Sequence, residues 1–160
     1  MLKKFQTTDS GVLQIENYEN GCWIALTNPT AEELREVAEK YNVAADDLRA
    51  PLDEEERSRI EVEDEYTLIL VDIPTIEERN GKDWYGTIPL AIVVCSSAII
   101  TVCLEESPVL TAFMDGRVRN FYTYMKTRFI FQILYRNATL YLNYLRIIDR
   151  RSDSIEQKLH

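Results

Sequence analysis

The chain has 160 residues, of which 46% are hydrophobic and 28% are charged, and its formal net charge is −9. This length and balance are typical of one globular domain with a real core, and they exclude a disordered chain. The charge is uneven, because residues 31–83 hold 18 acidic and 7 basic side chains while residues 117–160 hold 9 basic and 3 acidic ones. An acidic body repels nucleic acid, so we expect no nucleic-acid partner, and divalent cations are its natural counter-charge.

The first third of the sequence predicts three short strands followed by two helices. Residues 2–7, 12–17 and 22–27 are apolar or alternating segments between turn signals, and the second and third are predicted to join around Asn20-Gly21. Thr30 with Glu33 three residues later is a capping box, which starts a helix with one apolar face over residues 30–41. A shorter helix is predicted over residues 44–50, and Pro51 either ends it or begins a further acidic turn.

The middle of the chain predicts a strand and then a buried hairpin. Residues 65–74 form the strand, which Pro74 is expected to end, and residues 77–84 form a polar turn. Residues 84–104 carry no charge and have the length of a transmembrane helix. Glycine, proline and a Ser-Ser pair interrupt this stretch, and β-branched residues crowd it, so two strands over residues 87–94 and 98–104 are the better interpretation.

Ser107-Pro108 then starts a helix that Asp115-Gly116 ends. Because helices and strands interleave, we predict an α/β fold, a three-layer α-β-α sandwich around a mixed sheet, over residues 1–123.

Residues 124–160 predict the beginning of a long stalk helix, since they contain no proline or glycine. One apolar row has four-and-three spacing: Leu134, Ala138, Tyr141, Leu145, Ile148, Ser152, Ile155 and Leu159. A second row is confined to the first part of the helix: Ile130, Ile133, Leu140, Tyr144 and Ile147. A rod of roughly 50 Å, at about 1.5 Å per residue, needs a partner helix, from its own chain or from another subunit.

Few side chains are candidates for chemistry. Cys22, Cys95 and Cys103 lie in apolar strings without a paired spacing, which indicates reduced core thiols. The only histidine is His160, so most zinc sites and histidine-dependent catalysis are excluded. No phosphate loop, dinucleotide fingerprint or nucleophile–base pair is present, and we therefore do not expect an enzyme.

The acidic segment of residues 46–64, with nine carboxylates and three arginines, has three possible roles. It is a solvated surface, a patch for a basic partner, or a cation site. Residues 53–56, followed by Arg57 and Arg59, are more typical of a solvated face with local ion pairs.

Four collinear pieces of the sequence resemble the cytoplasmic N-terminal domain of the CorA family of magnesium transporters. Residues 23–43 resemble its tryptophan strand and capped helix, and residues 45–71 its acidic helix, basic step and next strand. Residues 91–110 resemble its hairpin and following helix, and residues 140–160 the opening of its stalk helix. The family's two transmembrane helices and Gly-Met-Asn signature are absent from the 160 residues, so the resemblance implies a cytoplasmic fragment of a multi-pass protein of the cell membrane.

In this family, intracellular Mg²⁺ bound between the subunits of a homopentamer gates conduction. By motif position the resemblance makes Asp47 the sensing carboxylate and Asp46 its helper. It therefore implies Mg²⁺ as the regulatory or transported ion, further copies of the chain as partners, and membrane contact through segments that are absent here. Members of similar design move zinc, cobalt or nickel, so Zn²⁺, Co²⁺ and Ni²⁺ stay open as the ion. A soluble acidic oligomeric adaptor domain is the other alternative.

Overall fold

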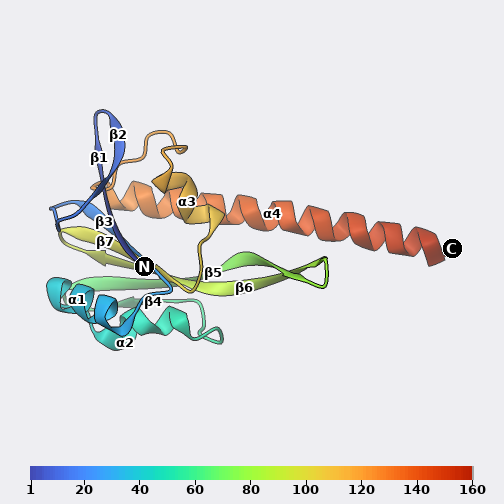
Figure 1. Ribbon diagram of the computed structural model, residues 1–160, viewed down its shortest axis with the longest axis horizontal. Helices are drawn as coiled ribbons and strands as arrows, with labels where there is room; N and C mark the ends of the chain where they lie inside the picture. Colours follow the sequence, from blue (N-terminus) through green and yellow to red (C-terminus); the bar gives the residue numbers. More distant parts are fainter. Residues whose placement is uncertain (160) are drawn as a thin grey trace.

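A seven-stranded mixed sheet forms the middle of the molecule, and helices cover both of its faces (Figure 1). The strands of this computed structural model, which describes residues 1–159, are β1 (Leu2–Thr8), β2 (Gly11–Ile15), β3 (Cys22–Thr27), β4 (Arg59–Val62), β5 (Tyr66–Arg79), β6 (Lys82–Cys95) and β7 (Ala98–Cys103). The helices are α1 (Ala31–Tyr41), α2 (Ala45–Arg49), the 3-10 turn η1 (Ala50–Leu52), α3 (Pro108–Met114) and α4 (Lys126–Leu159). The predicted three-layer α/β sandwich is confirmed.

The order of the strands is β2-β1-β3-β7-β6-β5-β4, with β3 and β7 as the parallel pair. The predicted pairing of the second and third strands is wrong, because β1 lies between β2 and β3 and pairs with both. Burial explains this order: β3 is buried along almost its whole length and belongs in the centre, whereas β2 has no buried residue and suits an edge. The N–H of Gly21, at φ 82°, donates to Ser97 O at 2.6 Å and leads the chain into β3.

The hairpin of β5 and β6 is longer than the sequence predicts. Pro74 does not end β5, which continues to Arg79, and the polar segment forms the far ends of both strands. Only Asn80 and Gly81 make the turn, and both have positive φ, as a two-residue hairpin of the favoured twist requires. Pro74 is tolerated because the β4 partner of β5 extends no further than Leu70, so beyond that point β5 is an edge strand.

The sheet separates two cores, because successive side chains of a strand point to opposite faces. Cys22, Ile24 and Leu26 of β3 pack toward α1 and α2, whereas Trp23 packs toward α3 and α4. The indole of Trp23 is fully buried among four phenylalanines, Phe5, Phe113, Phe121 and Phe129. Its N–H donates to the Thr101 hydroxyl at 2.9 Å, which satisfies two polar groups in an otherwise apolar core.

The capping box and the reduced core thiols that the sequence predicts are both present in the structure. Thr30 accepts from the Glu33 N–H at 3.1 Å, and Glu33 accepts from the Thr30 N–H at 2.9 Å, so α1 starts where predicted. Cys22, Cys95 and Cys103 are buried and free. The uncharged stretch, for which a membrane helix was the alternative, forms β6 and β7, and within residues 1–159 no helix is both long and apolar enough to span a bilayer.

Helix α4 packs on the sheet at its beginning and then extends beyond it, with the β5–β6 hairpin alongside (Figure 1). Asn137 and Tyr141 both donate to Asp72 O, at 3.0 and 3.1 Å. Further along, Tyr144 packs edge-on against Tyr85, and Arg151 forms an ion pair with Asp83 at 3.6 Å.

The predicted four-and-three row on α4 is half-buried at two positions near the domain and exposed further along the helix. Tyr141 contacts the domain through Asp72, and Leu134 is half-buried, so neither is exposed. The apolar side chains that stay exposed on the second half of the helix are Leu142, Leu145, Ile148, Ile155 and Leu159, which we call the stalk row.

Candidate functional site

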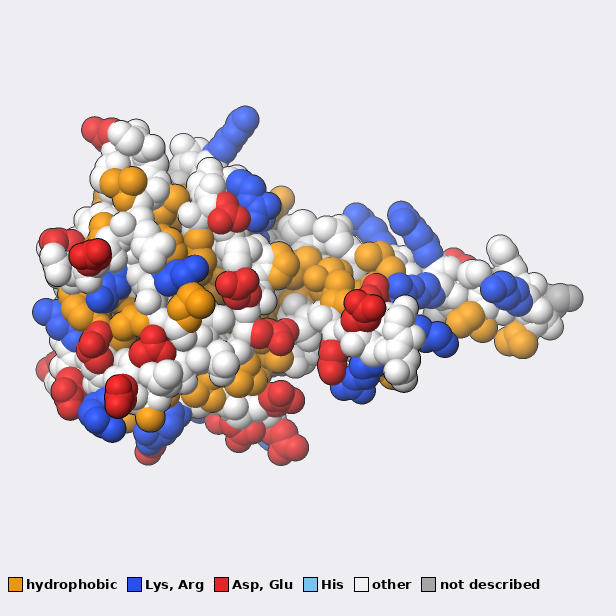
Figure 2. All heavy atoms as spheres, viewed as in Figure 1, with side chains coloured by type: hydrophobic (Ala, Val, Ile, Leu, Met, Phe, Trp, Pro, Cys, Tyr) orange, Lys and Arg blue, Asp and Glu red, His pale blue; other side chains and the backbone are white. Residues whose placement is uncertain are grey.

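The acidic segment lies on the face of the sheet that α1 and α2 cover. Leu48 of α2 belongs to the core on this face, whereas Phe129 and Ile133 of α4 belong to the core on the other. Figure 2 shows Asp and Glu side chains spread over the body of the molecule, and Lys and Arg side chains along the far part of α4. The chain's own stalk helix is therefore separated from the acidic segment by the sheet.

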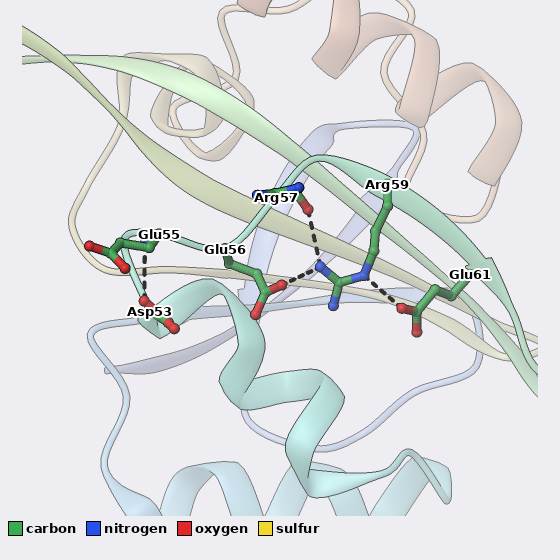
Figure 3. A network of polar contacts seen from close by, with 6 residues as sticks. All are labelled: Asp53, Glu55, Glu56, Arg57, Arg59 and Glu61. Atoms are coloured by element: carbon green, nitrogen blue, oxygen red, sulfur yellow. Dashed lines mark hydrogen bonds and ion pairs between the residues drawn. The ribbon is translucent and has the colours of Figure 1, made fainter.

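Arg59 organises the carboxylates that follow η1. Its guanidinium donates to Glu56, to Glu61 at 2.6 Å and to the backbone oxygen of Arg57 at 3.1 Å (Figure 3). The hydrogen bonds that Arg59 donates to Glu61 and then to Glu56 raise the pKa of Arg59 above its ordinary value. This part of the segment is the face with local ion pairs that the sequence predicts.

Three carboxylates from two elements meet next to this network. Asp47 comes from α2, Glu61 from β4 and Glu63 from the residue after β4, and one oxygen from each lies within 4.8 Å of the other two. Glu61 and Glu63 share a face because they are two residues apart in an extended segment. Asp47 and Glu61 are half-buried and Glu63 is exposed, so a hydrated ion could reach the cluster.

Tyr66, the first residue of β5, fixes Asp47 in this position. Its hydroxyl donates to Asp47 Oδ2 and accepts from the Ala44 N–H at 3.3 Å. Burial, followed by this hydrogen bond to Asp47, raises the pKa of Tyr66 to about 12. The phenol therefore stays protonated at neutral pH and remains a donor to the carboxylate.

The two predicted site residues lie in different surroundings. Asp47 is part of the carboxylate cluster, whereas the side chain of Asp46 is 90% exposed and pairs with Arg49 one turn on. Sequence reasoning did not identify Glu61, Glu63 or Tyr66. The alternation in residues 59–63 was the available signal, but it stands in a run of charges that did not predict a strand.

The cluster offers only oxygen ligands, which suits a hard divalent cation. Two oxygens on opposite sides of Mg²⁺ lie roughly 4 Å apart at its usual bond lengths, so a spread of 4.8 Å fits two direct ligands with the third through water. Arg59 holds one oxygen of Glu61, and its positive charge disfavours a cation nearby. The arrangement is therefore suited to weak rather than tight binding.

Comparison with known proteins gives one family. The family model described as CorA-like Mg²⁺ transporter protein matches residues 18–160. The chain is 26% identical over 141 residues to the cobalt/magnesium transport protein CorA of Methanocaldococcus jannaschii, a match that covers 84% of this chain. It spans 41% of that relative's length.

Solved structures share the fold. The soluble domain of CorA from Methanocaldococcus jannaschii superposes with a TM-score of 0.80 at 21% identity, over 99% of this chain and 64% of that one. The cytoplasmic domain of ZntB from Vibrio parahaemolyticus gives a TM-score of 0.69 at 14% identity, over 92% of this chain and 62% of that one. At these identities the likeness is one of architecture.

Proposed function

Because this chain belongs to the CorA-like Mg²⁺ transporter family, we propose that it is the cytoplasmic, ion-responsive domain of a membrane protein that transports divalent cations. Family membership and the shared fold support the proposal. The chain spans less than half of its curated relative, so the transport step itself is assigned to segments outside the 160 residues.

The cluster of Asp47, Glu61 and Glu63 is the observation that supports the proposed response to cations. Three carboxylates this close repel one another, and a bound cation relieves that repulsion. Asp47 is the proposed principal ligand, held in place by Tyr66, and the two glutamates complete the site directly or through water. The ion then stabilises whichever arrangement of α2 and β4 keeps the three carboxylates together.

Magnesium is the proposed ion, with cobalt as the second candidate. The name of the curated relative includes both metals. The cluster contains no nitrogen or sulfur ligand, and all three cysteines are buried elsewhere, which favours the harder ion. Zinc and nickel rank lower for the same reason.

Assembly with further copies of the chain completes the proposal, with a pentamer as the expected state. The stalk row leaves five large apolar side chains exposed on one helix, a pattern that neighbouring stalk helices would cover. Asp46, exposed on the same helix as Asp47, is then available to an ion held between subunits. Mg²⁺ at such a junction would favour the packed assembly over a splayed one.

Thermal unfolding at constant ionic strength tests the ion site. At a Mg²⁺ concentration ten times its Kd, we expect the free energy of unfolding to rise by about 1.4 kcal/mol. This corresponds to an increase in Tm of roughly 3–6 °C for a domain of this size. Sedimentation velocity on the same samples reports whether the ion also promotes association.

The matched variants are Asp47→Asn and Glu63→Gln, with Glu54→Gln as the control. Asparagine still accepts a hydrogen bond from Tyr66, and Glu63 and Glu54 are exposed, so none of the three should disturb the fold. The two site variants should lose the Mg²⁺ effect on Tm, and the control should keep it. An equal increase in Tm for wild type and Asp47→Asn would contradict the proposed site.

A further inference from the structure

A second charged feature lies on the opposite side of the molecule, at the start of α4. Residues 117–120, which follow α3, and the first turns of α4 line a shallow, open hollow of about 600 Å³. Four arginines line it: Arg117, Arg119, Arg128 and Arg136. We propose that this hollow, which we call the arginine hollow, binds a nucleoside di- or triphosphate.

The charges in the arginine hollow are largely uncompensated. Arg117 pairs with Asp115 at 3.0 Å, but Arg119, Arg128 and Arg136 form no ion pair within residues 1–159. In a chain with 27 acidic and 18 basic residues, three unpaired guanidinium groups around one hollow are unexpected. Like charges in proximity destabilise one another, and a bound polyanion removes that repulsion.

Guanidinium groups are suited to phosphate in particular. Their planar fork of N–H donors matches phosphate oxygens in a bidentate way, and the resulting hydrogen bonds are charge-assisted. Several arginines from two segments can contact more than one phosphate group at once. The hollow is therefore better suited to a di- or triphosphate than to a single carboxylate.

Exposed aromatic rings extend the arginine hollow on one side. Phe131 and Tyr135 also line it, and their side chains are 66% and 75% exposed. A nucleobase stacks on such rings, whereas an inorganic polyphosphate has nothing to place there. Tyr135 and Arg136 line an adjoining hollow as well, which extends toward Val109 and Leu140 and gives room for the rest of a nucleoside. This combination of arginines and exposed rings suits a nucleotide better than an inorganic polyphosphate.

The frame of the arginine hollow is formed without a ligand. The side-chain amide of Gln132 donates to Arg119 O at 3.0 Å and to Asn120 O at 3.4 Å, so the loop is tied to α4. Arg136 lies over the Phe113 ring, with 5.9 Å from its guanidinium carbon to the ring centre. Its Nε atom is buried and has no hydrogen-bond partner. A site of this kind needs side-chain adjustment rather than folding to accept a ligand.

Isothermal titration calorimetry of the 160-residue chain with ATP tests the inference. The buffer contains a chelator, so the result does not depend on the carboxylate cluster or on Mg²⁺. Tripolyphosphate, adenosine and vesicles containing phosphorylated inositol lipid are titrated in parallel. We expect saturable 1:1 binding of ATP, weaker binding of tripolyphosphate, and no binding of adenosine or of the vesicles.

Substitutions distinguish the protein's contacts to the phosphate groups of ATP from its contacts to the base. Arg119→Gln/Arg128→Gln should weaken ATP and tripolyphosphate at least tenfold. Phe131→Ala should weaken ATP at least fivefold and leave tripolyphosphate unchanged. The charge-matched control is Arg146→Gln/Arg150→Gln on the same helix, which should leave ATP binding within twofold of wild type.

Three results would overturn the proposal. The first is no ATP binding at millimolar concentration, and the second is a loss in the control equal to that in Arg119→Gln/Arg128→Gln, which would indicate attraction by overall charge. The third is binding of the vesicles in preference to ATP, which would assign the hollow to a lipid headgroup. All four replaced arginines and Phe131 are exposed, and circular dichroism verifies that each variant is folded.

Discussion

Replacing Trp23 by phenylalanine tests whether the buried indole N–H is held by Thr101 as the structure describes. Trp23 is fully buried, and the Thr101 side chain that accepts its hydrogen bond is also buried. The smaller ring keeps most of the packing against the four phenylalanines but leaves the Thr101 hydroxyl without a partner. An unsatisfied buried group of this kind costs about 1–3 kcal/mol.

The lost edge of the indole adds a second contribution. A residual cavity on the order of 40 Å³ costs about 1 kcal/mol, at about 24 cal/mol per Å³. Together the two effects predict that Trp23→Phe lowers the free energy of unfolding by about 2–4 kcal/mol. This is a large share of the roughly 5–15 kcal/mol typical of a domain.

A double-mutant cycle with Thr101→Val isolates the hydrogen bond. Thr101→Val alone orphans the indole N–H and should cost about 1–3 kcal/mol, whereas the double variant leaves neither group unsatisfied. We expect the double variant to cost about 1–2 kcal/mol less than the sum of the single changes. Urea unfolding followed by circular dichroism gives all four values. Effects that add within about 0.3 kcal/mol would refute the reasoning.

Two further predictions concern the cap of α1 and the buried thiols of β6 and β7. Thr30→Ala removes the capping box of α1 and should lower the free energy of unfolding by about 1 kcal/mol, whereas Thr30→Ser should retain most of that stability. Urea titration of both variants checks this prediction. Equal losses of stability in the two variants would contradict the role of the cap. Burial raises the pKa of Cys95 and Cys103 to about 11 from 9.0. The two thiols therefore lose their protons at a lower pH in the unfolded chain than in the folded one. Their contribution to the free energy of unfolding is complete below about pH 9 and falls as the pH rises from about 9 to 11. Native protein should resist a thiol reagent at pH 8 and react when unfolded; equal rates in both states would refute the burial of the two thiols.

The layers of the fold were predictable because their signals are local. The capping box of Thr30 and Glu33 defines the start of α1, and the uncharged β-branched stretch defines β6 and β7. Strand order was not predictable in the same way. Asn20-Gly21 is a hairpin signal, yet β3 pairs with β7, because an almost wholly buried strand is stabilised most in the middle of the sheet.

Prolines and charges produced the remaining errors. Pro74 is compatible with β5 only because no strand pairs with β5 on that side beyond Leu70, a fact of topology that no local pattern contains. β4 was missed because its charged residues are typical of a loop, although Arg59 forms ion pairs there with Glu56 and Glu61. The same oversight hid Glu61 and Glu63 from the candidate site, while Asp47 was identified through the family resemblance.

The parallel pairing of β3 with β7 has a consequence for folding during synthesis. The strands β1, β2 and β3 leave the ribosome before β7, and β3 can pair at once with β1. Its second partner, β7, follows only after the chain from Asn28 to Ser97 has been made. Until then the most apolar strand of the N-terminal segment has an open edge, with unpaired backbone groups that can join a foreign strand. The slowest event in forming this molecule should therefore be the closure of its centre, and aggregation of nascent chains should decrease sharply once β7 is available.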